Sequence, residues 1–95
     1  MLHIVNKSPA QTTALASCLR LAKPGQALLL TEDGIYAATT SAGWAEKMKH
    51  LEVYVLQPDV AARGMAGKLV DGVKAVDYAG FVDLVAEHST NQSWL

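Results

Sequence analysis

The chain has 95 residues, of which 51% are hydrophobic and 18% charged, and its formal net charge is −1. A chain of this length forms one domain with a modest core, so we expect a single domain over residues 1–95. The eight lysines and arginines are scattered, with no three of them together, so direct, independent nucleic-acid binding is not expected. A single cysteine excludes an internal disulfide and a cysteine-rich metal site.

The N-terminal segment MLHIVNKSP carries no basic leader, and its apolar run stops after Val5. A signal peptide is therefore not expected. No apolar run approaches the roughly 20 residues that a membrane-spanning helix needs. We expect a cytoplasmic protein without a membrane segment.

Four short apolar runs predict strands, and they alternate with segments of helical pattern. The runs are Leu2–Val5, Ala27–Thr31, Val53–Leu56 and Val73–Val76. The second and third are too apolar to have one face in water, which is typical of strands covered on both sides. The alternation predicts an α/β fold with a mostly parallel sheet of four or five strands, flanked by helices and joined by right-handed crossovers.

Helix signals lie between these runs. Ser8 is expected to cap the first helix, with Pro9 as its first residue and Gln11 completing a capping box. The segment Lys23–Gly25 is expected to end it. Shorter helices are predicted after Gly34, over 44–50 and after Pro58. A last helix is predicted over 78–88, with one buried face that holds Phe81, Val82, Val85 and, less firmly placed, Tyr78.

Polar residues follow every predicted strand, at the edge of the sheet where ligands of open α/β folds bind. The segments are Asn6–Ser8, Glu32–Gly34, Gln57–Asp59 and Asp77–Tyr78. The carboxylates of Glu32 and Asp33 suit acid–base chemistry or a hard cation, but the same residues are typical of a turn into a helix. Neither a glycine-rich phosphate loop nor a metal-ligand spacing among the three histidines occurs, so no cofactor and no metal are predicted.

Cys18, the only cysteine, lies in the middle of an apolar arc of the first helix. Free cysteine is often buried and packs as a small hydrophobic residue. A reactive thiolate is favoured at a helix N-terminus or beside a cation, and Cys18 is more than two turns beyond the expected cap. Its own surroundings therefore favour a structural role, with sulfur chemistry as the alternative.

Several blocks of the sequence, in this order, resemble the DsrH/TusB family. They are MLHIVNKSP, LLLTEDGIYAA, VYVLQPDVAARG, VDYAGFVDLV and the final SWL. The resemblance implies a DsrE-like fold and a place as the smallest of three related subunits. It also implies a heterohexamer with DsrE/TusD-like and DsrF/TusC-like partners, two copies of each. Such complexes pass persulfide sulfur toward 2-thiouridine at the tRNA wobble position, or handle sulfur in the cytoplasm during sulfur oxidation.

The resemblance also bears on which subunit carries sulfur. The principal sulfur-carrying cysteine of the family belongs to the DsrE/TusD subunit, in a loop that follows a strand. The comparable segment here is Leu56 to Met65, and it contains no cysteine. An accessory, non-catalytic subunit is therefore the leading hypothesis. Because the DsrH branch can carry a cysteine in the first helix, a sulfurtransferase that uses Cys18 as its catalytic residue is the first alternative.

Two further hypotheses concern surfaces. Trp44, Trp94 and Leu95 are candidate anchors of a subunit interface, since tryptophan is favoured in interface cores. Packing of Trp44 within its own domain is the alternative for that residue. A free-standing domain that binds a small ligand through Glu32, Asp33 and Asp59 is the third functional hypothesis, and no sequence motif supports it.

Overall fold

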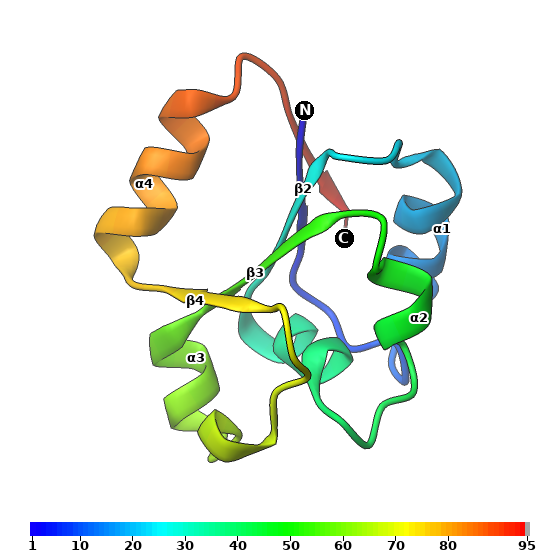
Figure 1. Ribbon diagram of the computed structural model, residues 1–95, viewed down its shortest axis with the longest axis vertical. Coiled ribbons are helices and arrows are strands. Elements are labelled where there is room, and N and C mark those ends of the chain that lie inside the picture. Colours follow the sequence, from blue (N-terminus) through cyan, green and yellow to red (C-terminus); the bar gives the residue numbers. More distant parts are fainter. Residues whose placement is uncertain (95) are drawn as a thin grey trace.

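A five-stranded parallel sheet forms the centre of the computed structural model, which describes residues 1–94 (Figure 1). Its strands are β1 (Leu2–Val5), β2 (Ala27–Leu30), β3 (Glu52–Leu56), β4 (Lys74–Val76) and β5 (Asn91–Trp94). Their order across the sheet is β4-β3-β2-β1-β5, and every neighbouring pair is parallel. The predicted α/β class and parallel sheet are confirmed.

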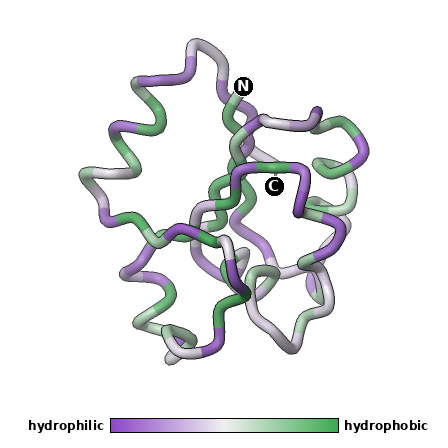
Figure 2. The backbone as a smooth tube through the Cα atoms, viewed as in Figure 1, coloured by the Kyte–Doolittle hydropathy of each residue, from purple (hydrophilic) through white to green (hydrophobic). Residues whose placement is uncertain are grey.

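The four predicted strands are present with small shifts at their ends. The fifth strand, β5, was not predicted by any apolar run. Its sequence, NQSW, has one hydrophobic residue, and its first three residues are exposed. An edge strand that pairs only with β1 does not need the apolar pattern of a strand buried on both faces. In Figure 2 the hydrophobic colour lies on the central strands and also on segments of α1 and α4.

Most helices cover one face of the sheet. These are α1 (Ala14–Leu21), the 3-10 helix η1 (Glu32–Ala38), α2 (Ala45–Met48), α3 (Gln57–Ala62) and the 3-10 turn η2 (Ala66–Lys68). Each connection from β1 to β4 moves one strand in the same direction, so right-handed crossovers place all of them on the same side. Buried residues of α1, η1, α2 and α3 form one core with β1, β2 and β3.

The helix α4 (Tyr78–Glu87) lies on the opposite face, apart from the other helices (Figure 1). The connection from β4 to β5 runs back across the whole sheet, and a right-handed path then requires the other face. Leu84 and Phe81 of α4 pack on a second, smaller core beneath it. The strand residues buried in that core are Leu2, Ala27 and Leu29.

The predicted start of the first helix is wrong. The Ser8 amide does donate to Gln11 Oε1 at 3.0 Å, as a capping box requires, but the residues between them form a turn. The α-helix begins at Ala14. Local cap chemistry at Ser8 is therefore satisfied by a single turn, and the helix begins where the apolar residues Ala14 and Leu15 reach the core.

The predicted buried face of the last helix is also wrong. Leu84 is buried and Phe81 partly buried, whereas Tyr78, Val82 and Val85 are exposed. The helix is apolar around most of its circumference, so periodicity alone did not show which side packs on the sheet. In residues 1–94 no helix is both long and apolar enough to cross a membrane.

Candidate functional site

The carboxyl edge of the sheet is the first place to look for a site, because ligands of open α/β sheets bind where neighbouring crossovers leave to opposite faces. Here that point lies between β3 and β4: α3 follows β3 on one face, and α4 follows β4 on the other. Gln57 and Asp77 are the first residues beyond these strands. Asp77 accepts a hydrogen bond from the Gly80 amide at 2.8 Å and so caps α4.

Three of the polar segments that follow predicted strands lie together at this edge. Asp59 Oδ2 accepts a hydrogen bond from the Glu32 amide at 2.6 Å, and the Asn6 side-chain amide donates to Glu32 Oε2 at 3.1 Å. Glu32 has φ 49, in the left-handed region that residues other than glycine seldom adopt. These two bonds tie the turns after β1, β2 and β3 together and hold Glu32 in that conformation.

Arg63, at the C-terminal end of α3, completes the cluster. Its Nε lies 2.9 Å from Asp33 Oδ1, and its Nη1 lies 3.8 Å from Asp59 Oδ1. The hydrogen bond from Arg63 lowers the pKa of Asp33. Desolvation opposes this shift, and the positive charge of Arg63 adds to it. The same contact raises the pKa of Arg63. The pair is a charged link between η1 and α3.

We therefore interpret the cluster as a structural clasp. Each of its carboxylates already has a partner within the chain: Asn6 for Glu32, and Arg63 for Asp33 and Asp59. Within residues 1–94, no three histidine, cysteine or acidic side chains gather as metal ligands would. Sequence reasoning missed Arg63, although its position four residues after Asp59 on a helix was a usable signal.

Close packing at this edge depends on Gly34. A Cβ atom added there would lie 2.3 Å from the carbonyl oxygen of Val5 at the end of β1. At Gly34 the turn after β2 thus approaches the backbone of β1 so closely that only glycine, which has no Cβ, fits there. This contact fixes η1, and with it Asp33, against the end of the sheet.

Cys18 lies on the inner side of α1 and is not part of the clasp. Its side chain is fully buried and belongs to the core shared with β1 and β2. Burial raises the pKa of its thiol to about 11. At neutral pH the sulfur is therefore a protonated thiol, which is a poor nucleophile.

Trp44 is half-buried at the start of α2, and its outer side separates two shallow depressions. One, of about 310 Å³, is shared with Ser8, Pro9, Tyr36 and Thr39 among others. The other, of about 350 Å³, is bounded by Ala16, Leu19, Arg20 and Lys47. The ammonium group of Lys47 lies 4.6 Å from the centre of the Trp44 ring. Trp44 therefore packs within its own domain, and the rest of its ring borders these depressions, with Lys47 over one face.

Trp94, at the end of β5, packs beside His3 of β1. Its indole N–H donates to His3 Nδ1 at 3.2 Å, so the proton of the neutral imidazole is on Nε2, which lies 2.8 Å from Gln26 Oε1. His3 is buried and its ring nitrogens are both used. The rest of Trp94 lines an open depression of about 450 Å³ with Leu21, which is 67% exposed. Leu95 lies outside the described residues.

Sequence comparisons identify the relatives of this chain. The family model described as DsrH like protein matches residues 7–91. Protein TusB of Escherichia coli O81 (strain ED1a) is 36% identical over 96 residues, which cover 99% of this chain and all of the relative. Protein TusB of Shigella flexneri matches to the same extent.

Solved structures show the same fold at lower sequence similarity. The ychN protein of E. coli superposes with a TM-score of 0.83 at 18% identity, covering 98% of this chain and 97% of that one. MTH1491 of Methanobacterium thermoautotrophicum, a protein of unknown function, gives a TM-score of 0.74 at 13% identity, with 97% and 96% covered. Since the family model and the TusB relatives both span nearly the whole chain, this protein belongs to the DsrH/TusB family of sulfur-relay subunits.

Proposed function

We propose that this protein is an accessory, non-catalytic subunit of a cytoplasmic sulfur-relay complex that serves 2-thiolation of the tRNA wobble uridine. It acts as a single DsrE-like domain and packs against DsrE/TusD-like and DsrF/TusC-like subunits in a heterohexamer with two copies of each. In this role it shields and positions the persulfide that a partner carries. Use of the same complex in sulfur oxidation is the alternative pathway.

The burial of Cys18 carries this proposal. A sulfur relay step requires a thiolate that attacks the outer sulfur of a donor persulfide and releases the donor as a thiol. The only sulfur nucleophile of this chain is fully buried, and its pKa is raised to about 11. Both the thiolate population and the access of a donor are therefore unfavourable in this fold.

The carboxyl edge supports the same conclusion. In the family the relay cysteine follows a strand, and the comparable segment here, Leu56 to Met65, begins beside the switch point between β3 and β4. This segment holds Asp59 and Arg63, which are engaged in the clasp, and no cysteine. The position where a thiol would meet a donor is used here to fasten α3 to η1.

Trp44 and Trp94 are proposed as partner contacts, together with Leu95. Each of the two tryptophans is partly buried by its own domain and has a remaining side at an open depression. An aromatic ring already held by its own domain loses little conformational freedom on binding, which suits it as an interface anchor.

The first test is the native mass of the tagged chain recovered from its own cells. We expect a heteromer with two other small subunits in equal amounts, and a mass that corresponds to two copies of each. Recovery of the chain alone, or as a homo-oligomer, would contradict the accessory role.

Mass spectrometry of the same complex tests sulfur carriage by Cys18. After exposure to a persulfide donor, we expect a partner cysteine to gain sulfur that a reductant removes. We expect no gain of sulfur on Cys18. Sulfur on Cys18 of the intact complex would establish the sulfurtransferase alternative.

A further inference from the structure

The outer face of α4 is a second apolar surface of this helix, and its own chain does not cover it. We define this face by Tyr78, Val82 and Val85, which are 60%, 65% and 37% exposed, and by the exposed Ala79 and Ala86. Successive residues of a helix are about 100° apart, which places these five side chains on one side. Phe81 and Leu84 lie on the other side and pack on the sheet.

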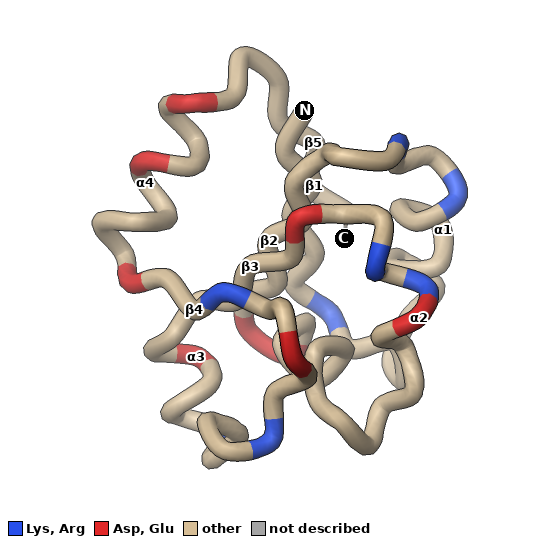
Figure 3. Tube along the Cα trace, viewed as in Figure 1, with Lys and Arg blue, Asp and Glu red and all other residues tan. Residues whose placement is uncertain are grey.

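Acidic residues border this face. Asp83 and Glu87 follow the apolar side chains around the helix and are exposed. All eight lysines and arginines of the chain lie within residues 1–74, whereas residues 75–95 carry three acids and no base. Figure 3 shows that α4 carries red segments and no blue, whereas blue segments lie on and around α1 and α2, on the chain beyond α3 and on β4, next to the start of α4.

The charge decides which class of partner fits. Nucleic acids and the surfaces of anionic membranes are negative and are repelled by an acidic rim. A protein surface with an apolar strip and basic residues at its margin is attracted to it. A second copy of α4 would bring further carboxylates and no cation to the contact, which disfavours symmetric pairing of this face.

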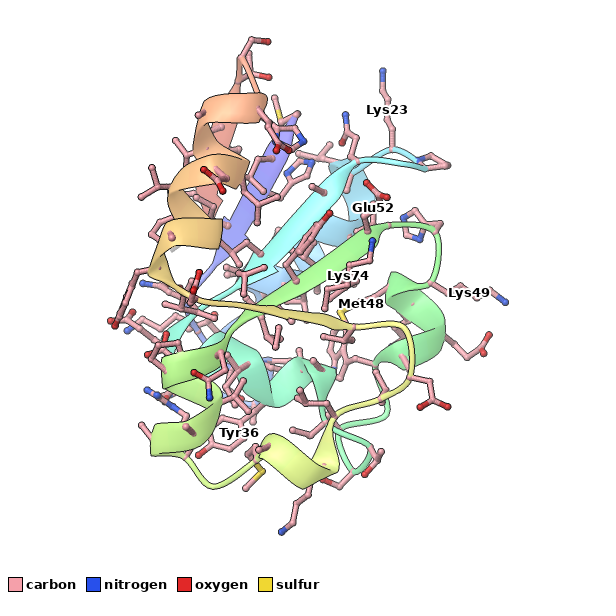
Figure 4. All side chains as sticks on the ribbon, turned by 60° about the vertical axis from the view of Figure 1, so that its left-hand side comes forward. Lys23, Tyr36, Met48, Lys49, Glu52 and Lys74 are labelled. Atoms are coloured by element: carbon pink, nitrogen blue, oxygen red, sulfur yellow. The ribbon has the colours of Figure 1, made fainter. Side chains whose placement is uncertain are left out.

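The open part of the sheet extends the surface. A 10-residue helix is about 15 Å long, too short to bury the roughly 800 Å² per partner of a standard interface by itself. Beside α4, Tyr54 of β3 is partly buried, and Lys74 of β4 lies over its ring at 5.6 Å. Figure 4 shows Lys74 and Glu52 on these neighbouring strands. A partner seated on α4 can also cover this strip.

We propose that the outer face of α4 is the surface through which this chain docks onto a protein partner whose own surface is an apolar strip bordered by lysine and arginine. This inference rests on the proposed function in taking the partner to be another subunit of the relay complex. It adds the location of the interface and the chemistry of the partner.

The test compares variants of the tagged chain recovered from its own cells. Val82→Glu places a charge in the centre of the apolar face, and we expect the amount of copurified partner to fall at least tenfold. Ala61→Glu places the same charge at an exposed position of α3 and should leave the partner bound. Because both positions face solvent, the isolated variants should melt at the temperature of the wild-type chain.

The acidic rim is tested separately. Asp83→Lys combined with Glu87→Lys should release the partner, and Asp71→Lys, at an exposed turn elsewhere, should not. High salt should weaken the wild-type complex. It should also reduce the difference in the amount of copurified partner between the two variants.

Each outcome bears on the inference in a stated way. A wild-type heteromer that Val82→Glu leaves intact overturns the inference and leaves the accessory role standing. A partner that is lost with Val82→Glu but is no relay subunit supports the docking surface and contradicts the proposed function. If the wild-type chain is a homo-oligomer and Val82→Glu disrupts it, a partner with a basic margin is the wrong occupant. If the wild-type chain is recovered as a monomer, both proposals are overturned.

Discussion

The two faces of the sheet are covered in different ways. On one face, α1, η1, α2 and α3 pack over β1, β2 and β3 and bury an extensive core that includes Cys18. On the other face, α4 stands alone over a small core of four buried residues. The first face buries its core within this chain, apart from the open depressions beside Trp44 and Trp94. The second keeps an exposed apolar helix surface, and so it is the face on which an additional layer fits.

Substitution of two adjacent leucines in β2 should measure this difference most directly. Leu28 and Leu29 are both fully buried and point to opposite faces. We expect Leu28→Ala to lower the free energy of unfolding by about 4 kcal/mol and Leu29→Ala by about 2–3 kcal/mol. The crowded face cannot close around a cavity, whereas a single helix can shift toward the sheet. Denaturant unfolding of both variants gives the comparison, and equal losses would mean that α4 is held as rigidly as the other face.

Gly34 tests the tight contact at the end of the crowded face. Gly34→Ala places a Cβ at 2.3 Å from the Val5 carbonyl oxygen, so η1 or β1 must move. We expect a loss of about 3 kcal/mol in the free energy of unfolding. Gly67→Ala is the matched control, because a Cβ at Gly67 meets nothing within 4 Å. A loss of similar size at both positions would show that the effect is not steric.

Cys18 tests whether its sulfur is needed for the core. Cys18→Ser puts a hydroxyl group at a fully buried, mainly apolar position, and we expect a loss of about 1–2 kcal/mol. The partner subunits should still copurify with this variant. In the wild-type chain, alkylation of the thiol should be slow until the protein unfolds. Loss of the complex in Cys18→Ser would contradict the view that this side chain is dispensable for assembly.

The pH dependence of stability provides a further check on Cys18. The pKa of the thiol is about 11 in the folded chain, where it is buried, and 9.0 where it is not. As pH rises, the unfolded state therefore releases the thiol proton first. The contribution of this thiol to the free energy of unfolding is fully present below about pH 9 and is lost between about pH 9 and 11. The decrease should be absent in Cys18→Ala, as thermal unfolding at several pH values can establish.

The smallest effect is expected at the clasp. The pKa of Asp33 is lowered by Arg63, so its contribution is present above the usual value of 3.8 and is lost as pH falls through the lower folded pKa. Arg63→Met should therefore lower the melting temperature slightly at neutral pH and make stability less dependent on pH in the acid range. Lys68→Met removes an exposed cation outside the clasp and should change neither property.

Much of this protein follows from its sequence alone. The apolar runs predicted four strands close to their observed positions. The signal is strongest for β2, which is buried along its whole length and is wholly hydrophobic, whereas β4 is a mostly exposed edge strand. Polar residues after each run predicted where a site could lie, because the carboxyl ends of parallel strands share one edge. The structure brings Asn6, Glu32 and Asp59 together at that edge. The position of Cys18 within an apolar arc predicted its burial.

Tertiary structure alone decided the rest. An apolar helix such as α4 has no unique inner face in its sequence, so the placement of Leu84 inside and Val82 outside depends on the path from β4 to β5. The strand β5 forms because β1 offers a free edge, and its own residues carry no strand pattern. Arg63 acquired its role from the approach of α3 to η1. Local patterns determine which segments are buried, whereas the direction of each crossover determines what lies beside them.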